Sequence, residues 1–124
     1  MNKNIQLKST LILFFILISP TAQSATMEQT VKLSAAGGAL CKIYAEELGG
    51  DVQAFSEMNI MTMQIAEKMG YTTNLQPYLS EVNKIKTVLK NQLLEKHGSK
   101  INIYNDWCIR FYNGFQNGIA KAYK

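Results

Sequence analysis

The two cysteines, Cys41 and Cys108, are the residues of this 124-residue chain that point most directly to a covalent bond. A secretion signal at the N-terminus, described below, sends both to a compartment where thiols are oxidised. One intramolecular pairing is possible, so we expect a structural disulfide between them. The alternatives are a bridge between two chains or a redox-active pair, and the absence of a Cys-x-x-Cys arrangement disfavours the redox role.

Closely spaced methionines are the second group with possible chemistry. Met58, Met61 and Met63 carry thioether sulfurs, which are soft ligands that select Cu(I). On a helix Met58 and Met61 follow the apolar stripe whereas Met63 points elsewhere, so we expect flexible core filling rather than a metal site. The single histidine, His97, cannot by itself complete such a site. A copper or small-ligand carrier remains an alternative function, and no cofactor is expected.

Residues for catalysis are few. Acid-base catalysis needs titratable groups that converge, and the acidic residues are scattered over helix ends and polar faces. Glu46 and Glu47 are adjacent, so on a helix they point in different directions. With one histidine and no serine at a recognisable spacing from it, the sequence also lacks a nucleophile pair. We therefore expect that the protein is not an enzyme and has no catalytic residues.

Aromatic residues gather near the C-terminus, at Tyr104, Trp107, Phe111, Tyr112, Phe115 and Tyr123. One face of a helix cannot bury all of them, because Tyr112 and Tyr123 lie off the stripe that contains Cys108 and Trp107 lies at its edge. Large aromatic and arginine side chains dominate protein-binding hot spots. We expect a partner-binding surface made of Trp107, Arg110, Tyr112 and Tyr123; the alternative is that the aromatics only complete a small core.

The N-terminal segment is typical of a secretory signal peptide. Lys3 and Lys8 precede an apolar run over 11–18, and Ser19-Pro20 and small residues follow it. We expect cleavage after Ser24, which gives a signal peptide of residues 1–24 and a single mature domain of residues 25–124; cleavage after Ala25 and an uncleaved signal anchor are the alternatives. The apolar run is about half of the roughly 20 residues that a bilayer span needs, so we expect no membrane span in the mature chain and a periplasmic location.

Charge is distributed unevenly along the mature chain. Removal of Lys3 and Lys8 from the 13 basic residues leaves 11, against 9 acidic residues. Residues 25–83 contain three basic and seven acidic residues, whereas residues 84–124 contain eight basic and two acidic residues. This pattern indicates two solvated faces of opposite sign, or a basic surface for an anionic partner. Nucleic acid is not expected, because no arginine-rich or aromatic-interleaved stretch accompanies the charge.

Glycine and proline divide the mature chain into stretches that repeat apolar residues every three or four positions. The pattern predicts an all-α fold, a small four-helix bundle with helices over about 27–48, 51–69, 74–98 and 102–122. Thr26 and Gln29 have capping-box spacing, Gly49 ends the first helix and Asp51 caps the second. We expect a buried stripe on each helix: Leu33, Ala36, Leu40, Tyr44 and Leu48; Phe55, Met58, Met61, Ile65 and Met69; Tyr78, Val82, Ile85, Leu89 and Leu93; Tyr104, Cys108, Phe111, Phe115, Ile119 and Ala122.

One early and one late cysteine, with Tyr104-Asn105 shortly before Cys108, resemble the spackle-type phage inhibitors of peptidoglycan-cleaving lysozyme. The disulfide-bonded helical pattern also resembles secretion-system pilotins of the non-lipidated kind. From the residues we expect a small secreted protein that binds another periplasmic or envelope protein, as an inhibitor, an immunity factor or a secretion or assembly accessory. The first resemblance implies the alternative of a lysozyme-inhibitor-like superinfection factor of phage or plasmid origin. The oligomeric state stays open.

Overall fold

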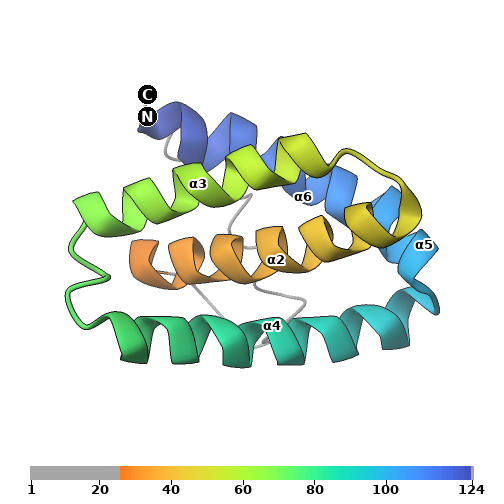
Figure 1. Ribbon diagram of the computed structural model, residues 1–124, viewed down its shortest axis with the longest axis horizontal. Coiled ribbons are helices and arrows are strands. Elements are labelled where there is room, and N and C mark those ends of the chain that lie inside the picture. Colours follow the sequence, from red (N-terminus) through yellow and green to blue (C-terminus); the bar gives the residue numbers. More distant parts are fainter. Residues whose placement is uncertain (1–25, 124) are drawn as a thin grey trace.

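The computed structural model describes residues 26–123, so the predicted signal peptide lies outside the described residues. Within this range the chain forms helices joined by short turns and contains no strand, which confirms the all-α prediction (Figure 1). No helix in this part of the chain combines the length and apolar character that a membrane crossing requires. The elements are α2 (Met27–Leu48), α3 (Val52–Lys68), α4 (Leu75–His97) and a last helix composed of α5 (Lys100–Asn102), η1 (Ile103–Cys108), α6 (Ile109–Phe115) and η2 (Gln116–Ala120).

The helix ends follow the capping residues read from the sequence. The backbone amide of Gln29 donates to Thr26 Oγ1 and the amide of Thr26 donates to Gln29 Oε1, each at 3.0 Å, so the capping box is present. Gly49 ends α2 in the left-handed conformation with φ 73°. Asp51 Oδ1 accepts from the amide of Ala54 at 3.0 Å and thereby begins α3.

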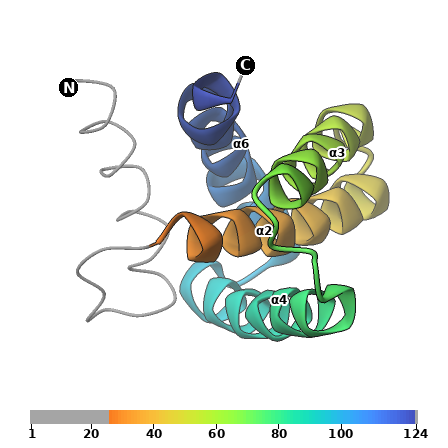
Figure 2. The same ribbon diagram turned by 90° about the vertical axis from the view of Figure 1, so that its left-hand side faces the viewer.

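Helix α2 is the centre of the fold. It is flanked by α3 and α4, and the last helix covers a third side (Figures 1 and 2). Because three helices surround it, α2 buries residues on most of its circumference rather than on one stripe. Its small residues let the neighbours approach closely, and a Cβ built on Gly37 would lie only 2.5 Å from Phe111 Cζ.

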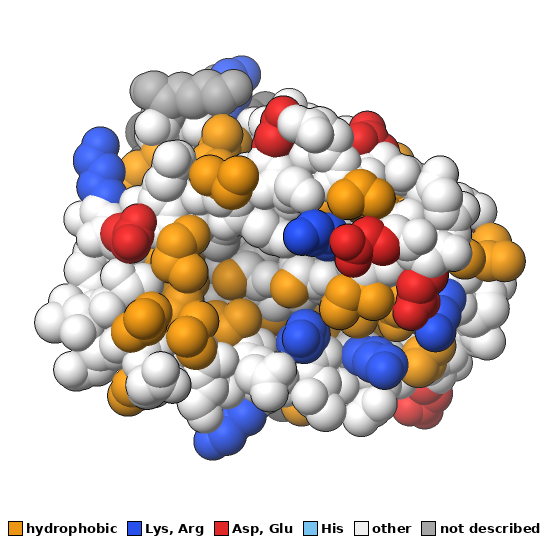
Figure 3. Space-filling view, in the orientation of Figure 1, with side chains coloured by type: hydrophobic (Ala, Val, Ile, Leu, Met, Phe, Trp, Pro, Cys, Tyr) orange, Lys and Arg blue, Asp and Glu red, His pale blue; other side chains and the backbone are white. Residues whose placement is uncertain are grey.

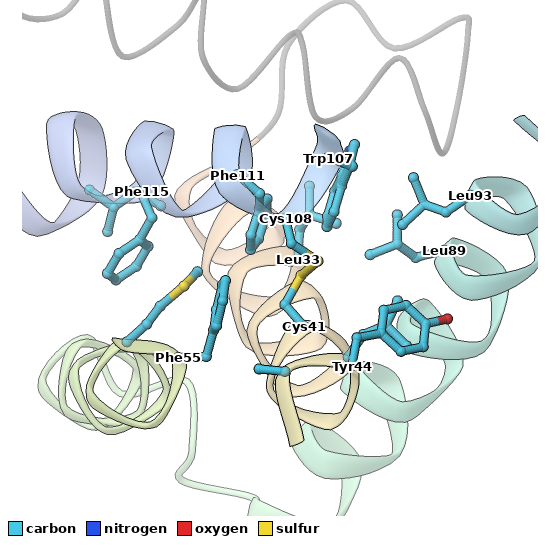
Figure 4. Close-up of a cluster of buried hydrophobic side chains, with 14 of the residues drawn as sticks. Leu33, Cys41, Tyr44, Phe55, Leu89, Leu93, Trp107, Cys108, Phe111 and Phe115 are labelled. Atoms are coloured by element: carbon cyan, nitrogen blue, oxygen red, sulfur yellow. A yellow bond between two sulfur atoms is a disulfide. The ribbon is translucent and has the colours of Figure 1, made fainter. Parts of the chain in front are cut away.

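A disulfide between Cys41 and Cys108 joins α2 to η1, which confirms the predicted pairing. The two Cα atoms are 5.8 Å apart and both side chains are fully buried. Figure 4 shows the bond inside the main hydrophobic cluster, between the aromatic rings of α3 and of the last helix and the leucines of α4. The bond therefore lies where the central helix meets the helix farthest from it in sequence.

Three residues expected in the buried stripes are exposed instead, namely Leu48, Met69 and Ala122. Leu48 and Ala122 lie at or near the C-terminal ends of their helices and Met69 directly follows α3, so all three lie where helix packing ends. Met61, Val82 and Ile85 are partly buried, while the remaining stripe residues are buried. The last helix begins at Lys100, two residues before its predicted start, because Ser99 acts as its N-cap and accepts from the amide of Asn102.

Candidate functional site

Trp107, expected at the surface of the last helix, is buried with 4% of its area exposed. Its ring stacks on Phe111 with centroids 4.5 Å apart, and Figure 4 places it toward Leu89 and Leu93 of α4. The expectation of an exposed tryptophan is therefore wrong. The last helix packs against α2 and also contacts α4, so the edge of its apolar stripe is covered as well as the centre. The π-helical turns of η1 bury Ile103, Tyr104, Trp107 and Cys108 together.

The other three residues of the expected binding surface have local partners. Tyr112 is half-buried, and its ring meets Phe55 edge-on at 5.6 Å. The hydroxyl of Tyr123 donates to Met69 Sδ at 3.2 Å. Of the four residues only Arg110 is exposed, and its Nε donates to the carbonyl of Asp106 at 3.0 Å. Contact of Trp107, Arg110, Tyr112 and Tyr123 with a partner stays a prediction. All three aromatic side chains among them already pack or hydrogen-bond within the protein.

The weak metal candidates Met58, Met61, Met63 and His97 are not brought together at one place by the described contacts. Met58 is buried beneath α2, its Cε 3.6 Å from the position of a Cβ on Gly38, and Met61 lines a hollow of about 300 Å³ beside Tyr123. Met63 is about 200° from Met61 around α3, as expected for residues two apart on a helix. His97 is the last residue of α4, a helix that makes few contacts with α3. Among the described residues, no three His, Cys, Asp or Glu side chains group as metal ligands.

An ion network in which a buried lysine meets two exposed glutamates, near the start of α2, was not predicted from the sequence. Lys32 is 8% exposed, and its Nζ lies 2.8 Å from Glu28 Oε2 and 2.9 Å from Glu81 Oε2. Burial lowers the pKa of Lys32, but the hydrogen bonds and charges of the two glutamates outweigh burial and raise this pKa above 10.5. The i, i+4 spacing of Glu28 and Lys32 was the available signal. A polar hollow of about 270 Å³ beside this network is lined by Tyr71 and Tyr78.

The exposed strip of α2 is narrow and made of small residues. Between residues 30 and 41, every residue of α2 is buried except Ala35 and Ala39, which are one turn apart and half-buried. Their strip continues at Lys42 and Glu46, which occupy the same side of the helix at spacings of i+7 and i+11 from Ala35. The strip stays open because α3 and α4 both pack on α2 but make few contacts with each other.

Together these helices form a surface that we call the α3–α4 groove. Figure 3 shows a hollow between α3 and α4, with hydrophobic side chains toward its left end and lysine or arginine side chains along its lower border farther right. Helical spacing and partial burial assign residues to the floor and to the two walls. They are Ala35 and Ala39 on the floor, Ser56, Asn59 and Met63 on α3, and Leu75, Leu79 and Val82 on α4.

Helix α4 gives the groove an apolar and a basic part. Leu75 and Leu79 are 47% and 40% exposed, and Lys86 and Lys90 continue the same side of α4 at spacings of i+11 and i+15 from Leu75. Neither these two lysines nor Lys42 of the floor forms an ion pair with any described residue. The sequence signal for this face was the apolar pair Leu75 and Leu79, which lies outside the buried stripe of α4. Without knowledge of the neighbouring helices, this pair does not differ from ordinary exposed leucines.

Comparison with known proteins gives no relative from which a function can be transferred. No protein family, no curated protein and no solved structure matches this chain. The resemblances noted from the cysteines and the helical pattern receive no support from these comparisons.

Proposed function

We propose that this protein is a small binding protein that holds another protein in the α3–α4 groove. The observation that carries the proposal is the pair Leu75 and Leu79, exposed along the open strip of Ala35 and Ala39. Single exposed apolar residues are normal, but several that border one hollow are typical of an interaction site. The area covered by a partner would include apolar side chains from all three helices.

The composition of α4 supports the same proposal. Only Tyr78, Leu89 and Leu93 of its 23 residues are buried, so the helix contributes little to the core for its length. Its remaining surface holds the two exposed leucines and unpaired lysines. A helix of this kind is suited to form one wall of a groove, as in helix-in-groove recognition, where the partner supplies the helix that lies in the groove.

The N-terminal signal pattern favours a partner outside the cytoplasm. We propose that the protein acts in the periplasm or cell envelope as an inhibitor, an immunity factor or an accessory of secretion or assembly. The scattered acidic residues and the lone histidine favour binding over catalysis. The function is therefore proposed to depend on occupancy of the groove by a protein and not on a reaction.

The test uses a matched pair of substitutions on α4. Leu79 and Val88 are 40% and 43% exposed, and their spacing of nine residues places them on opposite sides of the helix. The full chain with a C-terminal tag is expressed in the cells that naturally produce it and cross-linked, and captured proteins are quantified for wild type, Leu79→Glu and Val88→Glu. Circular dichroism and thermal unfolding establish that all three are folded.

We expect one protein to be captured by wild type and by Val88→Glu and to be lost with Leu79→Glu. Equal capture by the two variants would reject the groove as the binding site. If the folded wild type captures nothing above the level of untagged cells, the binding function itself is contradicted.

A further inference from the structure

We infer that the segment seated in the α3–α4 groove is an amphipathic helix of the partner that carries carboxylates at one end. This inference rests on the proposed binding function and names the chemistry of the partner.

A helix fits the groove better than a strand does. An extended segment leaves its backbone N–H and C=O groups in need of partners, and the described residues offer no strand edge to pair with them. The small apolar floor at Ala35 and Ala39 provides no side-chain hydrogen bonds. A helix satisfies its backbone groups internally and can lie on such a floor at little cost.

The small floor also permits close helix packing. Interaxial distances of about 8–10 Å depend on the side chains at the contact, and alanine allows the short end of this range. The open strip from Ala35 to Glu46 spans roughly 16 Å at 1.5 Å per residue, which equals about three helical turns. Ser56 of α3 is another small side chain on the border of the groove.

The charges around the groove indicate which end of the bound helix carries carboxylates. Its apolar residues face Leu75, Leu79 and Val82, and beyond them Lys86 and Lys90 border the groove without ion-pair partners among the described residues. Lys42 on the floor is a third cation without an ion-pair partner among the described residues, and Glu46 follows it one helical turn later. The net positive charge complements glutamate or aspartate residues at the end of the partner helix that meets these lysines.

The experiment maps the bound segment directly. Photoreactive benzoylphenylalanine replaces Leu75 in the full tagged chain, where a large apolar side chain is already exposed, and the cross-linked partner peptide is sequenced. That segment is then synthesised as a peptide, and its Kd is measured for wild type, for Lys86→Glu/Lys90→Glu and for the control Lys84→Glu/Lys121→Glu, which has the same net charge. Lys84 points away from the groove side of α4, and Lys121 lies on the last helix.

The expected result is an amphipathic helical segment with carboxylates at one end that binds Lys86→Glu/Lys90→Glu about tenfold more weakly than wild type at low salt. The control keeps its affinity within about twofold, and a peptide with those carboxylates changed to lysine binds the reversed variant better than wild type. An extended segment, a segment without carboxylates, a second copy of this chain or equal affinity for both double variants would overturn the inference. If Leu79→Glu loses capture while Lys86→Glu/Lys90→Glu does not, the binding function holds and only the charge assignment is wrong. No cross-link from position 75 of the folded protein would overturn both.

Discussion

The ring of Phe111 lies against the backbone of Gly37, so that a Cβ at position 37 would approach Phe111 Cζ to 2.5 Å and Cε2 to 2.7 Å. Gly37 is one turn before Cys41 on α2, and Phe111 is three residues after Cys108 on the last helix. The close approach and the disulfide therefore hold the same pair of helices at one contact. This contact fixes the last helix on α2 and leaves the opposite side of α2 open as the groove.

Gly37→Ala is expected to destabilise the protein by about 1–3 kcal/mol, because the new methyl group meets the rigid ring of a fully buried phenylalanine. Gly38→Ala is the matched control on the same helix. Its new methyl group meets Oδ1 of Asn59, the end of a side chain that can rotate away, and alanine favours the helix by about 1 kcal/mol. Urea unfolding of both variants measures the difference, and equal stabilities would contradict the close packing of Phe111.

Loss of the disulfide is expected to lower the free energy of unfolding by up to about 4 kcal/mol. The bond closes a loop of 67 residues, which removes conformational entropy from the unfolded chain. The variant Cys41→Ala/Cys108→Ala and the reduced wild type should unfold at similar urea concentrations, both well below the oxidised protein. A double variant as stable as the oxidised wild type would show that the bond contributes little.

The network of Lys32 predicts opposite pH dependences for two proteins. In wild type the folded-state pKa of Lys32 is raised above the unfolded value of 10.5, so its contribution to stability is present below that pH and is lost as the pH rises through the folded-state pKa. In Glu28→Gln/Glu81→Gln burial remains without the two charges, so the folded-state pKa of Lys32 falls below the unfolded value. This variant should be about 2 kcal/mol less stable at pH 7 and regain stability relative to wild type as the pH rises toward 10.5.

The control for this prediction is Glu46→Gln/Glu67→Gln, which removes two exposed carboxylates that form no ion pair with the described residues. Burial also raises the pKa of Tyr44 and of Tyr78 in the folded protein. Every version of the protein therefore loses stability above pH 10, where these hydroxyls ionise in the unfolded chain. The readout is therefore the difference in unfolding free energy between each variant and wild type at pH 7, 9 and 10.5. A difference that stays constant with pH would remove Lys32 as its cause.

Tyr104 is expected to stabilise the turn between α2 and α3 through its hydroxyl. Its Oη accepts from the amide of Asp51 at 2.8 Å, and its ring lies close to Gly50. Tyr104→Phe removes the acceptor and should cost about 1 kcal/mol in unfolding free energy. Tyr112→Phe serves as the control, because no hydrogen bond of the Tyr112 hydroxyl is found among the described residues. Faster amide hydrogen exchange at Asp51 in Tyr104→Phe alone would localise the effect, and equal exchange in the two variants would contradict it.

The local structure of this protein was readable from its sequence. The bounds of α2, the caps at Thr26 and Asp51 and the pairing of Cys41 with Cys108 depend on neighbouring residues, on turn chemistry or on the only two cysteines available. The buried stripes followed from the spacing of apolar residues for the same reason. The wrong predictions of burial lie near helix ends, as at Leu48, where burial depends on whether a neighbouring helix packs there.

The tertiary structure decided the surface. A sequence gives the angle of Trp107 around its own helix but not the number of helices packed against that helix. The last helix contacts both α2 and α4, and Trp107 is therefore buried. The same limit applies to Lys32, whose partner Glu81 is 49 residues away. It applies equally to Ala35 and Ala39, whose positions match those of core alanines in the sequence but remain partly open because α3 and α4 make few contacts with each other. Periodicity therefore determined which residues share a face, whereas exposure of that face depended on contacts between segments distant in the chain.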